Sequence, residues 1–265
     1  MWRVVCVSIA LLFICLSVPG AGWSEENFFQ IINDISTPVN PDFSRDFGYA
    51  VYVNYDGKRF LLDTGKFETS LAENMEAAGV LLDSLDFVLL SHRHRDHTGG
   101  LAYIRSERPS LPIYIPPGGG FERFKPEELI EVNDHLRVSP NIFLIHTHNE
   151  FGSAGIKDEL GLLIITKKGP YVFTTNSHTD FFATLEKAKR LAIKDIFFHS
   201  GGTARRRSSE ETIRANAKKL KALNIRKVSP SHSNPNHDRI FKEGFGANYV
   251  ASRLGQKVPL EPVLK

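Results

Sequence analysis

Four side chains that commonly bind metal ions lie close together in the chain, at His92, His94, Asp96 and His97. Residues two apart in an extended segment point the same way, so the first two histidines can converge on one ion. If the chain then turns into a helix, Asp96 and His97 project together toward a second ion. Imidazole and carboxylate are the ligands expected for zinc, with manganese or iron as alternatives, in a hydrolytic site. The pattern therefore predicts two divalent ions that can share and acidify one water molecule.

The segments on either side of this motif can hold it in place. Phe87–Leu90 is a short apolar run, which predicts a strand that leads directly into the histidines. Gly99 and Gly100 follow the motif, and because they lack a Cβ the backbone can pass close beneath the site. A solvated polar loop is the alternative interpretation of isolated histidines. The strand, the fixed spacing and the glycine pair together favour a metal site.

The rest of the chain alternates segments of strand and helix character. Apolar runs predict strands at residues 47–54, 59–62, 87–90, 112–115, 142–145, 160–166, 171–174, 195–198 and 226–228. Apolar residues at helical spacing predict helices at 69–78, 181–192 and 213–223. We expect Thr69 or Ser70 to cap the first helix and Gly79 to end it. This order predicts an α/β fold, a four-layered αββα sandwich in which two packed sheets carry helices on their outer faces.

The start of the chain has the composition of a secretory signal peptide. Arg3 precedes an apolar run at residues 4–16, interrupted by Ser8, and small residues follow at 20–22. The run is shorter than the roughly 18 residues that span a bilayer. We therefore expect cleavage of residues 1–22, no stable membrane anchor afterwards, and a single domain at 23–265 that is periplasmic or secreted. Both cysteines lie in this leader, so the mature protein would have no disulfide and no cysteine-ligated metal.

The charges of the chain are nearly balanced, with 33 Lys and Arg against 30 Asp and Glu. The longest run of one sign is the three arginines at 205–207, so we expect no binding to nucleic acid. Three guanidinium groups could instead hold a phosphate or carboxylate of an anionic small-molecule substrate. Alternatively, Glu210 and Glu211 neutralise the run and it forms a solvated surface.

The histidine motif after its strand resembles the signature of the metallo-β-lactamase superfamily. Upstream, the segment Leu-Leu-Asp-Thr-Gly at 61–65 is similar to that superfamily's first motif, whose aspartate, here Asp63, supports the metal loop from beneath. The resemblance extends roughly from Tyr49 to Ser233. It implies the αββα fold and a metal-dependent hydrolase, and it says almost nothing about the substrate.

A narrower resemblance is to the subfamily of dihydropterin-ribofuranosyl-aminobenzene-phosphate synthase-like metal-dependent hydrolases. Its short motifs occur in the same order in this chain, at residues 63–65, 90–92, 96–101, 158–162 and 176–178. The subfamily typically has Gly-Cys-Ser-His after the central strands. This chain has Thr-Asn-Ser-His at 175–178, so it keeps the histidine and lacks the cysteine.

The resemblance places His178 as the third ligand of the first ion, at the end of the strand at 171–174. The superfamily commonly has a bridging aspartate near this point, where this chain has Asn176 followed by a serine. His146 and His148 are the alternative third ligands, because the superfamily's third-motif histidine usually falls in this part of the chain. The subfamily has an acidic pair there instead, so we expect these two histidines to lie in a loop or to support the ligands.

The second ion is expected to take its third ligand from His232, which follows the last predicted strand and resembles the superfamily's final motif. His199 resembles the histidine of a Phe-His pair that the subfamily places beside the substrate. It would then act as a proton donor or oxyanion partner on the substrate side. A plain structural histidine is the alternative.

These residues favour an exported di-metal hydrolase, in which a metal-bound hydroxide attacks an ester, phosphoester, lactone or amide. Asp96 would both bind metal and orient the nucleophile. A group-transfer enzyme acting on a phosphorylated ribosyl compound is the second hypothesis, although export argues against it because such intermediates are cytoplasmic. A catalytically silent, metal-containing binding protein or sensor is the third, since the bridging aspartate is missing.

Overall fold

The structure is a computed structural model that describes residues 26–118, 120–121, 124, 129–176, 178–205, 207–232 and 235–263. The predicted leader lies outside the described residues. Among those residues, no helix is both long and apolar enough to cross a membrane.

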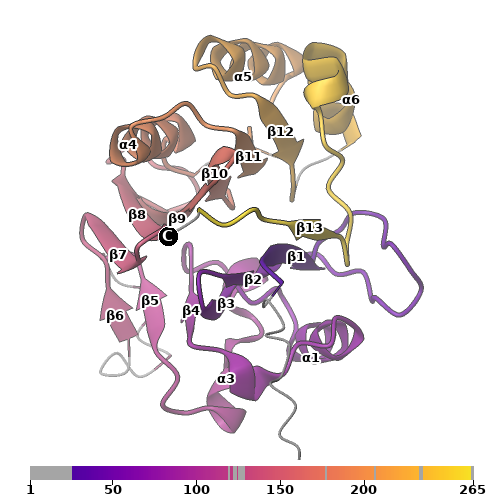
Figure 1. Cartoon of the computed structure of the whole chain (residues 1–265), viewed down its shortest axis with the longest axis vertical. Coiled ribbons are helices and arrows are strands. Elements are labelled where there is room, and N and C mark those ends of the chain that lie inside the picture. Colours follow the sequence, from indigo (N-terminus) through magenta and orange to yellow (C-terminus); the bar gives the residue numbers. More distant parts are fainter. Residues whose placement is uncertain are drawn as a thin grey trace, which may run out of the picture.

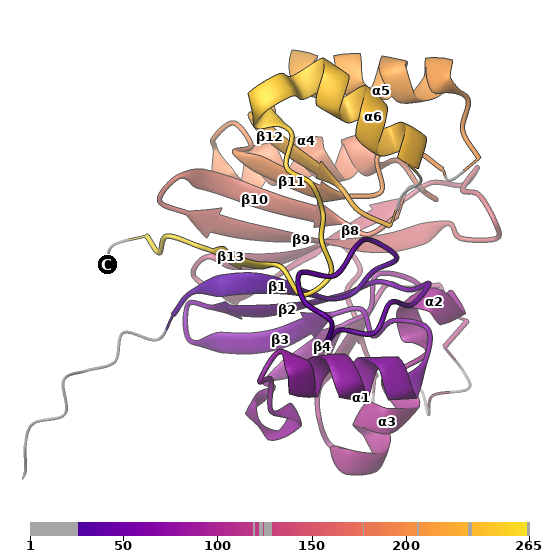
Figure 2. The same cartoon turned by 90° about the vertical axis from the view of Figure 1, so that its right-hand side faces the viewer.

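Two β-sheets face each other at the centre of the molecule (Figure 2). The first sheet has the strand order β13 (Lys257–Pro259), β1 (Phe28–Asn33), β2 (Ala50–Tyr55), β3 (Lys58–Leu62), β4 (Phe87–Leu89), β5 (Ile113–Ile115) and β6 (Leu129–Glu131). The second has the order β12 (Lys227–Pro230), β11 (Phe198–Gly201), β10 (Gly169–Thr174), β9 (Asp158–Thr166), β8 (Ile142–His148) and β7 (His135–Ser139).

Helices cover the outer face of each sheet (Figures 1 and 2). The first sheet carries α1 (Glu68–Ala77) and α3 (Leu101–Glu107), and the second carries α4 (Phe181–Ala192), α5 (Glu210–Ala222) and α6 (Pro235–Phe245). The short helix α2 (Arg95–Thr98) lies at one end of the sheets, and the chain also forms the 3₁₀ turns η1 (Leu82–Ser84) and η4 (Gly246–Asn248). The predicted four-layered αββα sandwich is confirmed.

Period-two alternation along the strands separates the core into layers. In β2, Val51 and Val53 point into the space between the sheets, whereas Ala50 and Tyr52 pack under the helices of the first sheet. In β9, Leu163 packs under the helices of the second sheet. Each central strand therefore buries both faces, which explains why its sequence is apolar almost throughout.

The helix ends follow local rules in some places and not in others. Asp180 caps α4 by accepting a hydrogen bond from the Phe182 N–H at 3.0 Å. The predicted cap of α1 is wrong, because the helix begins at Glu68, before Thr69 and Ser70, and its first turn has no side-chain cap. Gly79 follows the helix with φ of +67°, as expected of a glycine that ends one.

Parallel pairing brings distant strand ends to one edge. Strands β3, β4 and β5 are parallel neighbours in the first sheet, and β10, β11 and β12 are parallel neighbours in the second. Their carboxyl ends meet at the edge where α2 lies, at the right in Figure 2. The histidine motif after β4, His178 after β10 and His232 after β12 all follow these ends. This topology assembles the site.

Candidate metal centre

The first group of candidate ligands is His92, His94 and His178, whose ligand atoms all lie within 4.8 Å of one another. His92 Nε2 lies 3.1 Å from His94 Nδ1, and the ring centroids of His94 and His178 are 4.6 Å apart. The loop after β4 carries the first two, and the turn between β10 and α4 carries the third. Three imidazole nitrogens therefore converge as the sequence predicts.

The second group is Asp96, His97 and His232, which meet the same 4.8 Å limit. Asp96 Oδ2 lies 3.1 Å from His232 Nε2 and 3.7 Å from His97 Nε2. The His92 and His97 ring centroids are 4.1 Å apart, so the two groups are adjacent. His232 has a left-handed φ of +54°, and its N–H donates to Asp34 Oδ2 at 3.4 Å.

Asp63 supports both groups from beneath, as expected. It is fully buried, and its Oδ2 accepts a hydrogen bond from His97 Nδ1 at 2.6 Å. Its carboxylate also accepts from the N–H and Oγ of Ser91, at 2.7 and 2.8 Å. Ser91 Oγ in turn lies 2.9 Å from His92 Nδ1. The Nδ1 atoms of His97 and His92 are therefore engaged in hydrogen bonds, and the Nε2 atoms of both rings remain to face the ligand groups.

The electrostatic environment keeps the first group neutral. Burial lowers the pKa of His92, helped by the nearby His97 and His178, and burial also lowers the pKa of His94. Burial, followed by the influence of His94, lowers the pKa of His178 to about 3. Neutral imidazole is the form that binds metal, so these three side chains are ready ligands at neutral pH.

In the second group, neighbouring charges favour the ionised forms of Asp96 and His97. Burial alone would lower the pKa of His97, but the Asp63 carboxylate outweighs it and the net pKa is raised. Burial opposes ionisation of Asp96, yet the hydrogen bond from His232 and the nearby His97 lower its pKa below the usual range. The site thus combines an ionised carboxylate with two imidazoles.

The donor set fits two divalent ions. Within the described residues, the Nε2 atoms of His97 and His178 are buried and have no hydrogen-bond partner. Such atoms are costly to bury unless a ligand satisfies them. Three nitrogens at one position and two nitrogens with a carboxylate at the next are ligands typical of zinc, and also suit manganese or iron.

The alternative third ligands lie elsewhere. His146 Nε2 and His148 Nδ1 both hydrogen-bond to Asp158 Oδ1 at 2.8 Å, and neither belongs to the two ligand groups. His148 is half exposed, and it faces Asp158 directly across the β8–β9 pair. Of the three candidates, the structure brings only His178 to the first group.

His199 lies in the core rather than beside the two groups. It is fully buried in β11, its Nε2 is 2.8 Å from Thr174 Oγ1, and its ring stacks on Phe181 at 5.8 Å. Burial lowers its pKa to about 3, so the ring is neutral at pH 7. These surroundings match the structural alternative, and they give the predicted proton-donor role no support.

The buried carboxylate of Glu159 lies beside the site. No role for this residue was predicted from the sequence. Its Oε1 is 3.9 Å from His92 Nδ1 and has no hydrogen-bond partner among the described residues. Its Oε2 accepts from the N–H and Oγ1 of Thr179, at 2.8 and 2.6 Å. Burial raises its pKa. The signal in the sequence is an acidic pair at the start of an otherwise apolar strand.

The arginine run is only partly described, because Arg206 lies outside the described residues. Arg205 is exposed, and its charge contributes to lowering the pKa of His178.

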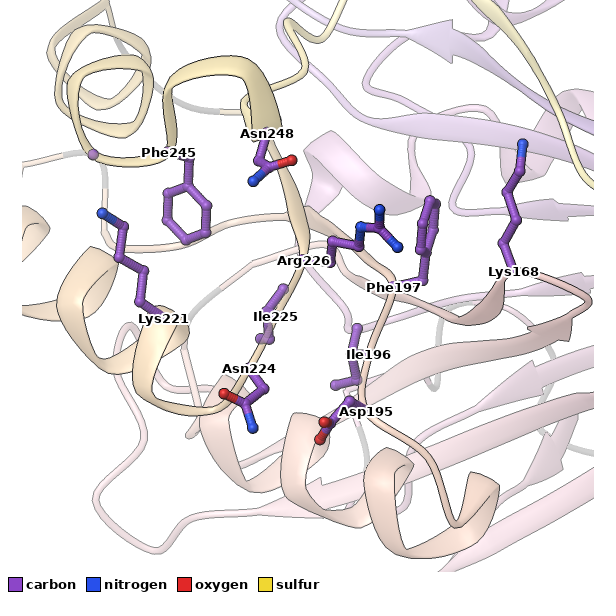
Figure 3. Close-up of a pocket in the computed structure, with 11 residues that line it drawn as sticks. Lys168, Asp195, Ile196, Phe197, Lys221, Asn224, Ile225, Arg226, Phe245 and Asn248 are labelled. Carbon is purple, nitrogen blue, oxygen red and sulfur yellow. The ribbon is translucent and has the colours of Figure 1, made fainter.

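A separate pocket of about 580 Å³ lies at the opposite edge of the second sheet, beside the segments that lead into β11 and β12 (Figure 3). Two of its cations lie over aromatic rings: Arg226 over Phe197 and Lys221 over Phe245, each at 5.5 Å. These stacking contacts already stabilise the charges. The chemistry-bearing side chains are at the other edge.

Comparisons with known proteins agree with this geometry. A family model described as the metallo-beta-lactamase superfamily matches residues 44–232. A relative in Methanocaldococcus jannaschii is 7,8-dihydropterin-6-methyl-4-(beta-D-ribofuranosyl)-aminobenzene-5'-phosphate synthase. The two sequences are 23% identical over 245 residues, and the alignment covers 75% of this chain and 83% of that protein. This match is to the namesake of the subfamily that the motifs resemble.

Two solved structures illustrate the shared fold. A metal-dependent hydrolase of the beta-lactamase superfamily aligns with a TM-score of 0.73 at 22% identity, covering 88% of this chain and 98% of that one. A diphosphatase from the PhnP family aligns with a TM-score of 0.62 at 18% identity, covering 90% and 100%. At these identities the likeness concerns the fold. Because the family model spans both ligand groups, the chain belongs to the metallo-β-lactamase superfamily.

Proposed function

We propose that this protein is an exported di-metal hydrolase acting on an ester, phosphoester, lactone or amide of a small molecule. The observation that carries the proposal is the pair of adjacent three-ligand groups, each containing a buried imidazole nitrogen that has no hydrogen-bond partner among the described residues. Bound at these groups, two divalent ions would acidify a water molecule and polarise the bond to be cleaved. Zinc is the ion that we expect.

The protein's own groups would orient the reaction. Within the second ligand group, Asp96 Oδ2 accepts a hydrogen bond from His232 Nε2, which fixes the position of the carboxylate. From there it can accept a hydrogen bond from the attacking water and align its lone pair. The positive charge of Arg205, which helps to lower the pKa of His178, would favour an anionic substrate.

A synthase is the second candidate, and the match to the M. jannaschii protein favours it. Such an enzyme would transfer a group to or from a phosphorylated ribosyl compound. Export of the chain would remove it from the cytoplasmic pool of such compounds, which is why we place hydrolysis first.

The test is elemental analysis of the purified protein together with a screen of phosphodiester, lactone, ester and lactam substrates. We expect about two transition-metal ions per chain and turnover of at least one hydrolytic class. Two bound ions without any hydrolysis, but with group transfer on a ribosyl phosphate, would support the synthase. Two bound ions with neither activity would support a binding protein.

A further inference from the structure

The loop between β8 and β9, residues 149–157, lies against two of the three ligands of the first group. The Ser153 N–H donates to the His178 carbonyl at 2.9 Å, and Ser153 Oγ lies 3.1 Å from His178 Nδ1. One residue further on, the Ala154 carbonyl lies 3.3 Å from His94 Nε2. Consecutive loop residues therefore contact both histidines on the sides that face away from the ligand group.

These contacts select the ring tautomers that can bind metal. Nε2 of His178 presents a lone pair only when Nδ1 carries the proton, and Nδ1–H then donates to Ser153 Oγ. The Ala154 carbonyl can only accept, so His94 must carry its proton on Nε2, and Nδ1 keeps the lone pair that faces His92. A partner on the far nitrogen of a metal-binding histidine fixes both the tautomer and the ring orientation.

The loop is braced well enough to hold these positions. Its ends are joined by the Asn149 N–H donating to the Lys157 carbonyl at 2.8 Å, and by an ion pair between Lys157 and Glu150. Arg93, which lies between His92 and His94 in the chain, donates from Nη2 to the Gly155 carbonyl at 2.8 Å. Gly152 permits the tight turn, because a Cβ there would lie 1.8 Å from the Ile156 carbonyl oxygen.

We propose that Ser153 is a positioning residue for His178, and that the β8–β9 loop sets the affinity of the first ion site. The inference rests on the proposed function, since it requires an ion at that site. The expected effect is specific to one site, because Ser153 contacts His178 of the first group, whereas His97 of the second group donates directly to Asp63. Loss of the Ser153 hydroxyl should weaken one ion and leave the other unchanged.

The test compares Ser153→Ala, Ser153→Thr and Phe151→Ala with the wild type. Phe151 lies in the same loop with its side chain 90% exposed, so its replacement controls for general effects of loop mutation. Affinities for Zn²⁺ are measured by competition with a chelator, and the visible spectrum of the Co²⁺-loaded protein reports the ligand geometry. We expect Ser153→Ala to weaken one of the two ions about 10- to 100-fold and to alter the Co²⁺ spectrum. Ser153→Thr keeps a hydroxyl and should restore both properties, and Phe151→Ala should change neither.

Equal affinities in Ser153→Ala and the wild type, with two ions bound, would overturn the inference and leave the proposed function standing. Equal weakening of both ions, or weakening by Phe151→Ala as well, would also overturn it, because the effect would then be a general one on the fold. A wild type that binds no ion would overturn the proposed function and this inference together.

Discussion

The histidines of the two ligand groups differ in what holds them. His97 donates to the buried Asp63 carboxylate, whereas His178 has a neutral serine hydroxyl as its partner. A carboxylate partner makes an imidazole a more basic ligand than a hydroxyl does. The first site, built on three neutral imidazoles, is therefore the one whose ion should be released first when a chelator is added.

Replacement of the third histidine tests the ligand assignment. We expect His178→Ala to remove about one ion per chain, because two imidazoles alone are a weak site. His146→Ala and His148→Ala should keep both ions, since these side chains bind Asp158 instead. Metal content after dialysis, measured by elemental analysis, gives the answer. If His148→Ala loses the ion and His178→Ala keeps it, the superfamily's usual third motif supplies the ligand.

Replacement of Asp96 by asparagine tests the catalytic role. The amide keeps the shape of the side chain but loses the charge that accepts from His232 and would align the water. Loss of a general base typically lowers the rate by roughly 10²- to 10⁴-fold. Hydrolysis by the metal-replete variant is the measurement, with circular dichroism as the control for folding. An unchanged rate would remove Asp96 from the mechanism.

At the scale of elements, the loop from β4 through α2 is held by close backbone contact with the loop before α1. The Gly99 N–H donates to the Gly65 carbonyl at 2.8 Å, and the Thr64 N–H donates to the His97 carbonyl at 2.8 Å. A Cβ on Gly99 would lie 1.9 Å from the Lys66 carbonyl oxygen. The glycine pair noted in the sequence is thus required by packing between two loops.

Addition of one methyl group at Gly99 should separate these loops. Overpacking of this kind typically costs about 1–3 kcal/mol, so we expect Gly99→Ala to lower the free energy of unfolding by that amount and to weaken metal binding. Gly244→Ala is the matched control: it lies within α6, and its Cβ would make only an ordinary contact of 3.9 Å with Ala217. Alanine there should stabilise the helix by up to about 1 kcal/mol. Urea denaturation of both variants measures the change in the free energy of unfolding. An unchanged free energy of unfolding in Gly99→Ala would contradict the prediction.

Across the whole molecule, the two sheets bury histidines both in the two ligand groups and in the core, where His199 lies. Burial lowers the pKa of several of these histidines, which makes the metal-free fold sensitive to acid. His199 isolates this effect, because burial is the sole cause of its shift and it lies outside both ligand groups.

Acidification should therefore destabilise the metal-free protein in part through His199. Its pKa is about 3 in the folded state, against a usual value near 6.5. Between these values the unfolded chain binds more protons than the folded one. The free energy of unfolding therefore decreases as the pH is lowered, by about 2 kcal/mol from pH 7 to pH 5 for this group. Urea denaturation in the presence of a chelator measures the loss. His199→Asn should lose about 2 kcal/mol less than the wild type over the same interval, and equal losses would contradict the assignment.

Export is a prediction about the whole chain. Protein recovered from its native host should lack residues 1–22, because an apolar run of this length after a basic residue is typical of a cleaved signal peptide. Intact-mass measurement checks this directly, since cleavage removes both cysteines. A mature species that retains Cys6 would place the protein in the membrane.

Several strands could not be predicted from the sequence. β13 is only three residues long and exists as a strand because Phe29 in β1 pairs with Val258. β6 and β7 are partly exposed edge segments whose apolar pattern is weak. Central strands such as β9 and β10 were predicted because burial on both faces forces apolar residues at nearly every position.

The sequence by itself determined the family, the fold class and the candidate metal-ligand motif, because short motifs and alternating apolar segments can be recognised along the chain. His92, His94, Asp96 and His97 are placed by a strand end and one helical turn. The resemblance already favoured His178 over His146 and His148, and only the tertiary structure shows a physical reason for that preference. It depends on strand pairing that sets His148 opposite Asp158, and on parallel strands that bring the end of β10 to the metal loop. The same is true of Glu159 and Ser153, whose contacts join segments far apart in sequence that only the packing of the two sheets brings together.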